Sequence, residues 1–318
     1  MTGRRDVFER IPGLVELREA QAGVCLRSQL GRLGVNSEDV ACHVDNLRWQ
    51  TVGPLLVVLH GGPFPQAARR WAVLLNAGRG AALGAWTALD EWGLRGWQRE
   101  PTHVVVARGA DPPLLPPELV GVVAVHESRR HTAQDVRRKG GLRLHSVERS
   151  AVDAATWSRS GRTACGVLAA TVQQRLTTAD RLLAELDVVG RVWGRRLMRG
   201  AVADIAGGSE ALSEIDFVRF CRHRGLPEPV RQSVRRDAAG RRRYLDVEWR
   251  LPDGRSLIVE IDGVGHVDVD RWYEDLLRTA ELVAGGSAEP LRLPALAVRL
   301  EPDRIERILR ILLGLVRS

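Results

Sequence analysis

Residues 256–266 have the sequence SLIVEIDGVGH, in which an apolar β-strand pattern carries two carboxylates. The aliphatic residues are typical of a buried strand, yet Glu260 and Asp262 stand among them. An unpaired carboxylate costs several kcal/mol when it is buried, so two in one strand need a reason. The neighbouring strand suggests one.

The segment 243–250 forms a second strand pattern, and Pro252, Asp253 and Gly254 form a turn signal between the two strands. A tight turn there pairs residues whose numbers sum to about 506 or 507, which places Asp246 opposite Glu260 or one step away. Residues two apart in a strand share a face, so an even sum puts Asp246, Glu260 and Asp262 on the same face.

Three converging carboxylates repel one another unless a cation lies between them. Oxygen ligands suit Mg²⁺ or Mn²⁺, and such an ion can polarise a phosphate and generate a hydroxide nucleophile. The sequence therefore predicts a metal site formed by Asp246, Glu260 and Asp262. The alternative is that Glu260 or Asp262 faces solvent and pairs with an arginine. His266 could be a metal ligand, a general acid or a loop residue.

Arginines cluster beside this acidic segment. Residues 219–243 contain nine Arg and two acids, whereas residues 246–275 contain nine acids and three Arg. Guanidinium groups suit phosphate backbones. The candidate DNA-binding side chains are Arg235, Arg236, Arg241, Arg242 and Arg243.

The whole chain has 318 residues, a formal charge of +8 and ordinary globular composition. Its excess of positive charge favours an anionic partner. No secretory signal and no membrane span are visible, and four scattered cysteines indicate neither a disulfide framework nor a zinc site. We therefore expect a cytoplasmic protein that does not associate with membranes.

The predicted fold class is α/β with several domains: residues 1–60, 61–206 and 207–318. In the first domain, helical patterns and a final helix at 37–49 precede a hairpin, the order of a winged helix-turn-helix. Arg48 would lie on the exposed face of that third helix. A small helical interaction module fits residues 14–59 equally well.

The middle region is predicted to be mixed α+β, with helices over 66–98, strands at 102–107, 121–128 and 142–146, and further helices over 147–205. His126, His131 and His145 match no metal-site spacing and are expected to be ordinary histidines. The last domain is predicted to contain a helix at 209–225, a three-stranded meander, a helix, a fourth strand at 290–300 and a closing helix.

Residues 209–310 resemble the PD-(D/E)XK nuclease superfamily, and within it the domains akin to very short patch repair endonucleases. The resemblance rests on SEIDFVRFCRHRGLPEP, YLDVEW, IVEIDGVGH, RWYEDLLRTAEL and LRLPALAVRLEPD. It implies a restriction-endonuclease-like sandwich with Asp246 and Glu260 as the two acids, and Glu214 as the acid of the leading helix. It also places His266 near a histidine that the repair enzymes use.

The chain departs from the superfamily at Asp262, which stands where most members have a lysine. Either Asp262 is an extra metal ligand, with an arginine or His266 as the electrophile, or cleavage has been lost. The first two thirds resemble AbiEi-like antitoxins of type IV toxin–antitoxin systems, through AQAGVCLRSQLGRLGV, GPLLVVL and LRLHSVERSAVDAA. That resemblance implies a DNA-binding winged helix and a possible cognate toxin.

Two functions follow. The first is a metal-dependent DNA endonuclease or nickase with an N-terminal DNA-binding domain and Mg²⁺ or Mn²⁺ as its cofactor. The second is a non-catalytic DNA-binding regulator of the antitoxin kind that carries a degenerate nuclease fold.

Overall fold

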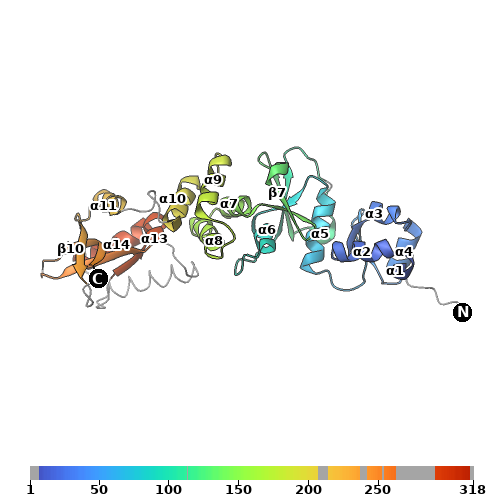
Figure 1. The fold of residues 1–318 in the computed structure, drawn as a ribbon, viewed down its shortest axis with the longest axis horizontal. Helices are drawn as coiled ribbons and strands as arrows, with labels where there is room; N and C mark the ends of the chain where they lie inside the picture. The colour runs from blue at the N-terminus through green and yellow to red at the C-terminus, as the bar shows by residue number, and fades with distance from the viewer. Residues whose placement is uncertain are drawn as a thin grey trace. The chain divides into compact units, whose positions relative to one another are not determined.

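The computed structural model describes residues 7–112, 114–206, 214–236, 242–252, 254–262 and 291–315. The chain forms two compact units, residues 1–153 and 154–318. Both contain helices and β-sheets, which confirms a multi-domain α/β protein (Figure 1). Within the described ranges, no helix is long and apolar enough to cross a membrane.

The first unit begins with four short helices and a small sheet. Their order is α1 Val7–Arg10, α2 Pro12–Ala20, β1 Val24–Leu26, α3 Arg27–Arg32, α4 Ser37–Asp45, β2 Gln50–Val52 and β3 Leu56–Val58. The strands form an antiparallel sheet in the order β1-β3-β2, and β2 and β3 form the predicted hairpin. Leu14, Leu30, Val40 and Trp49 are buried together beneath it.

Two details of this region differ from the sequence prediction. The strand β1 was not predicted, because a three-residue strand shows too little alternation to be recognised. The helix α4 ends at Asp45 rather than at residue 49, because the Asn46 side chain donates to the Cys42 carbonyl and Leu47 adopts a positive φ of 56°. Arg48 therefore lies beyond the helix that was expected to carry it.

The rest of the first unit is a mixed five-stranded sheet with helices. The elements are α5 Gln66–Ala77, β4 Ala82–Leu83, α6 Ala85–Trp92, β5 Thr102–Ala107, β6 Val123–Ser128, β7 Val136–Lys139 and β8 Leu142–His145, with 3-10 turns at Pro117–Leu119 and Ala133–Asp135. The sheet order is β6-β5-β4-β8-β7. The predicted strands at 102–107, 121–128 and 142–146 are confirmed, and α5 packs against strands of both sheets.

A long helix, α7 Val147–Ser158, spans the boundary between the two units. The second unit then contains α8 Gly161–Gln173, α9 Ala179–Val188, α10 Arg195–Ala206, α11 Glu214–His223, β9 Val230–Arg236, β10 Arg242–Arg250, β11 Ser256–Asp262, β12 Leu291–Pro294, α13 Ala295–Leu300 and α14 Pro302–Leu312. The sheet order is β12-β11-β10-β9. The strands β9, β10 and β11 form the predicted antiparallel meander, and β12 runs parallel to β11.

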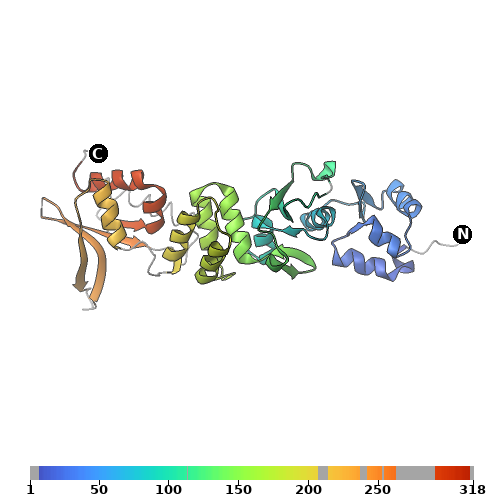
Figure 2. The same ribbon diagram turned by 90° about the horizontal axis from the view of Figure 1, so that it is seen from above.

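One core holds the second unit together. Val247, Trp249, Leu257 and Val259 lie on one face of the sheet and are buried with residues of α11, α13 and α14. Figure 2 shows these helices beside the sheet. Residues of α8 and α10 join the same core. The helices of 154–206 thus belong to the C-terminal unit, whereas the sequence assigned them to the middle domain.

The fourth strand of the second unit is shorter than predicted. Residues 290–300 were expected to be one strand, but β12 ends at Pro294 and α13 follows at once. Proline cannot donate a ladder hydrogen bond, and its fixed φ suits the entry to a helix. The predicted end of α11 is confirmed, because Gly225 adopts a positive φ of 62° there.

Candidate functional site

The β10–β11 hairpin carries the carboxylates on which the functional prediction depends. Its turn is closed by hydrogen bonds from Leu251 N to the Arg255 carbonyl (2.8 Å) and from Gly254 N to the Leu251 carbonyl (3.0 Å). Gly254 has a φ of 84°, a conformation in which glycine lacks the steric penalty of other residues. This turn fixes the register of the two strands.

That register is the even one. Val247 pairs with Val259 and Trp249 with Leu257, so paired residue numbers sum to 506. Asp246 directly precedes Val247 in β10, and Glu260 directly follows Val259 in β11. The two positions lie across from each other, on the face opposite the buried Val247 and Val259.

The parallel strand β12 adds the position of Arg292, whose side chain the structure does not describe. Glu260 is in register with Arg292, and Asp262 with Pro294. The backbone thus gathers the positions of three acids and one arginine on one face of the sheet. The side chains of Asp246, Glu260 and Asp262 lie outside what the structure describes.

Three other predicted site residues are also described only in part or not at all. Glu214 begins α11, with an undescribed side chain, while Arg241 and His266 lie outside the described residues altogether. In the part of the chain that the structure describes, no group of three or more His, Cys, Asp or Glu side chains could hold a metal ion. The fit of a metal at the hairpin therefore rests on the register and on the oxygen-donor chemistry of these residues.

The register of β9 and β10 places arginine positions opposite one another, although the structure does not describe their side chains. Arg236 pairs with Arg242, and Arg235 pairs with Arg243. Like charges directly opposite each other in a sheet are destabilising. An anionic partner would relieve that repulsion, so this arrangement fits a phosphate-binding role.

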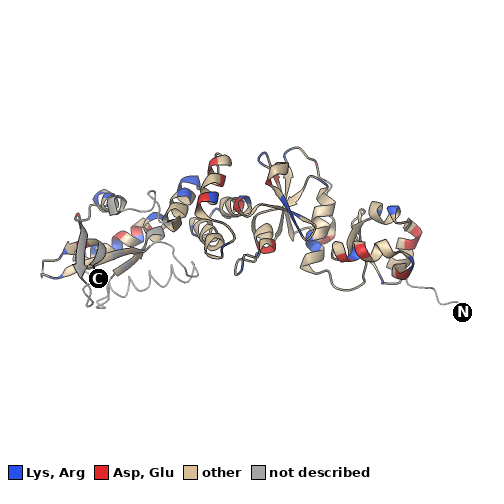
Figure 3. Cartoon of the chain, viewed as in Figure 1, with Lys and Arg blue, Asp and Glu red and all other residues tan. Residues whose placement is uncertain are grey.

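A second arginine cluster was missed by sequence reasoning. Arg195, Arg196 and Arg199 of α10 line an open hollow with Arg299 of α13, and positive charge follows α10 in Figure 3. A Cβ built on Gly200 would lie 2.8 Å from the Arg299 guanidinium, so glycine leaves room for that side chain. The sequence signal was the spacing of Arg195 and Arg199, which places them on one helix face.

Two arginines of this cluster share one acid. Asp187 accepts a hydrogen bond from Arg195 Nη2 (3.0 Å) and another from Arg199 Nη1. One carboxylate thus serves two of the four guanidinium groups that line the hollow. The hollow suits an anionic partner such as a phosphate backbone.

Four histidines of the first unit form two pairs. His103 Nδ1 lies 2.8 Å from His126 Nε2, and His131 Nδ1 lies 2.7 Å from His145 Nε2. Burial, together with His126, lowers the pKa of His103 to about 4. Burial also lowers the pKa of His126 and His131. The imidazoles of His103, His126 and His131 are therefore neutral at physiological pH and act as hydrogen-bonding groups.

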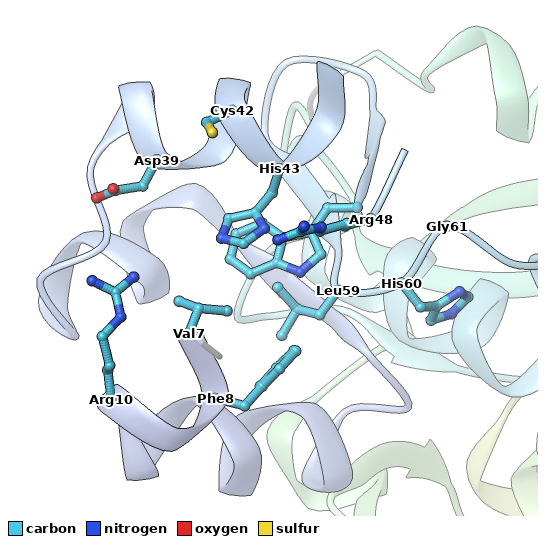
Figure 4. A pocket seen from close by; sticks show the side chains of 11 residues that line it. Val7, Phe8, Arg10, Asp39, Cys42, His43, Arg48, Leu59, His60 and Gly61 are labelled. Carbon is cyan, nitrogen blue, oxygen red and sulfur yellow. The ribbon is translucent and has the colours of Figure 1, made fainter. Parts of the chain in front are cut away.

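A pocket of about 590 Å³ lies in the N-terminal part of the first unit (Figure 4). It is lined by residues from α1, from α4 and from two later segments: Val7, Phe8, Arg10, Asp39, Cys42, His43, Arg48, Trp49, Leu59, His60 and Gly61. Four separate stretches of chain meet here, which explains why the sequence alone did not reveal the pocket.

A scan of the chain against models of protein families finds no match, and a search for similar curated proteins finds none either. The functional argument therefore depends on the residues and the geometry of this chain.

Proposed function

We propose that this protein is a metal-dependent DNA endonuclease or nickase with an N-terminal winged-helix domain that binds DNA. The observation that carries the proposal is the even register of β10 and β11, with Asp246 across from Glu260 and Asp262 two residues further along the strand. Carboxylates at these positions would hold Mg²⁺ or Mn²⁺. A bound ion of this kind polarises a phosphodiester and supplies a hydroxide nucleophile.

The chain's own residues would bind and orient the DNA. The paired arginines of β9 and β10 and the arginine cluster of α10 are suited to phosphates, whose contacts position a nucleic acid. The helices and the β1-β3-β2 sheet at the N-terminus follow the order of a winged helix, in which α4 would enter a DNA groove. We expect such a protein to act in the cytoplasm.

A second candidate is a non-catalytic DNA-binding regulator of the antitoxin kind, which would be paired with a toxin. Two observations favour it. Asp262 cannot supply the positive charge that a lysine would contribute to the transition state, and Arg292 stands in register with Glu260, where it could neutralise that carboxylate in place of a metal.

Plasmid cleavage distinguishes the two functions. Supercoiled plasmid is incubated with the wild-type protein in Mg²⁺ or Mn²⁺, beside Asp246→Asn and the control Asp303→Asn. Asp303 is an exposed acid of α14 that pairs with Arg224, so its loss should leave the site unchanged. The nuclease predicts nicking that Asp303→Asn retains and Asp246→Asn loses. Binding without cleavage by all three proteins would favour the regulator.

A further inference from the structure

The pocket of the N-terminal region has the size and lining of a small-ligand site. Its volume of about 590 Å³ lies within the ~300–1,000 Å³ typical of such sites. Val7 and Leu59 form buried parts of its wall, while Arg10 and Arg48 are exposed at its rim. The pocket therefore combines an apolar interior with charged groups that a ligand could reach.

Flat rings form one side of the pocket. The His43 imidazole stacks on the Trp49 indole, with 4.2 Å between ring centroids and 20° between their planes. The Phe8 ring lies 6.4 Å from Trp49, tilted by 59°, and Trp49 itself is only 2% exposed. Packed rings of this kind offer a rigid surface for a planar ligand.

The charged groups of the pocket favour an anion. Figure 4 shows the guanidinium groups of Arg10 and Arg48 on opposite sides of His43. Among the described residues that line the pocket, Asp39 is the single carboxylate, and it accepts a hydrogen bond from Asn36 N (3.1 Å) in the cap of α4. The pocket thus has two arginines and one acid, and that acid already accepts a hydrogen bond at the N-terminus of α4.

The wall behind these groups is fixed by the backbone. A Cβ on Gly61 would lie 1.9 Å from the Leu47 carbonyl oxygen, so the two segments touch where glycine allows it. The Gln50 side chain donates to the carbonyls of His60 (2.9 Å) and Gly62 (2.6 Å). The pocket is therefore held open by the fold and needs little ordering when a ligand binds.

We infer that this pocket binds a small planar anion: an aromatic or heteroaromatic ring that carries a carboxylate or a phosphate. The ring would lie against the His43–Trp49 stack, the anionic group would accept hydrogen bonds from Arg48 beside that stack, and Arg10 would add favourable charge from the other side. This site is separate from the proposed nuclease centre, and the inference does not depend on whether the protein cleaves DNA.

Calorimetric titration of the full chain with four probes tests the inference. AMP and 1-naphthoate each combine a ring with an anion, as phosphate and as carboxylate, whereas adenosine has the ring alone and inorganic phosphate the anion alone. The site predicts that AMP or 1-naphthoate binds at least about tenfold more tightly than either single-feature probe, and the better of the two identifies the anionic group.

Three variants that each lose one positive charge then show where the probe binds. Arg48→Gln should weaken the better probe by about tenfold, as the loss of one charge-assisted hydrogen bond does, and Arg10→Gln should weaken it less. Arg32→Gln, an exposed arginine of α3 away from this pocket, should leave affinity unchanged. Thermal unfolding of each variant verifies that the fold is intact. Absence of binding by every probe, equal competition by inorganic phosphate, or an equal effect of Arg32→Gln would overturn the inference.

Discussion

The Phe217→Ala substitution tests the core that supports the candidate hairpin. Phe217 of α11 is fully buried, and its ring meets the Trp249 ring of β10 edge-on, with 6.2 Å between centroids and 72° between planes. It also stacks on Phe220 at 5.8 Å. Phe217 therefore anchors α11 on the strand that carries Asp246.

The expected cost follows from that burial. Truncating a buried Phe to Ala costs about 3–5 kcal/mol, and an aromatic pair contributes roughly 0.5–1.5 kcal/mol beyond its buried area. Complete burial and two ring partners place Phe217→Ala at about 4 kcal/mol. Phe217→Leu keeps most of the apolar volume and should cost less than about 1.5 kcal/mol.

Hydrogen exchange followed by peptide mass spectrometry measures this cost locally. A loss of about 4 kcal/mol should speed exchange of the β10 and β11 amides by roughly a thousandfold. Peptides of β5 and β6 in the first unit provide an internal control and should exchange as in the wild type. Equal acceleration in both units, or a loss below about 1 kcal/mol in β10, would refute the proposed packing.

Two further predictions concern the first unit. Because burial lowers the pKa of His103 to about 4, against an ordinary value of about 6.5, the unfolded chain takes up the proton first as the pH falls. The stability that neutral His103 contributes should therefore be complete above pH ~6.5 and decrease as the pH falls to ~4. The urea midpoint of His103→Gln should depend less on pH in that window than the midpoint of the wild type. An equal pH dependence of the two midpoints would contradict this. Gly61→Ala should destabilise by about 3 kcal/mol because its Cβ would overlap a backbone carbonyl, whereas Gly31→Ala, in open space on α3, should stabilise by about 0.5–1 kcal/mol. Equal urea midpoints for the two alanine variants would show that the close approach at Gly61 is wrong.

Much of the fold could be predicted from local patterns. The turn at Pro252–Gly254 and the alternation on either side of it predicted the β10–β11 hairpin and the two registers open to it. The same reasoning failed where elements are short or tertiary contacts decide. The strand β1 has three residues, and the apolar run after Pro294 suits a strand and a helix equally well.

The candidate site was likewise predicted only where its residues are close in sequence. Periodicity was sufficient to place Asp246 and Glu260 on one face, because both belong to a single hairpin. It could not reveal the parallel pairing that puts Arg292 beside Glu260, since 31 residues of sequence separate Glu260 from Arg292. The pocket around Trp49 and the arginine cluster of α10 likewise depend on contacts between distant segments.

A divalent-metal titration of thermal stability tests the central claim most directly. Mn²⁺ is added to the wild type, to Glu260→Gln and to the control Asp303→Asn, and the unfolding of the second unit is followed. If Asp246, Glu260 and Asp262 form a metal site, metal at about a hundred times its Kd should stabilise the wild type and the control by about 2.7 kcal/mol, and Glu260→Gln much less. Equal shifts in all three proteins, or no shift in any, would contradict a metal site at this hairpin.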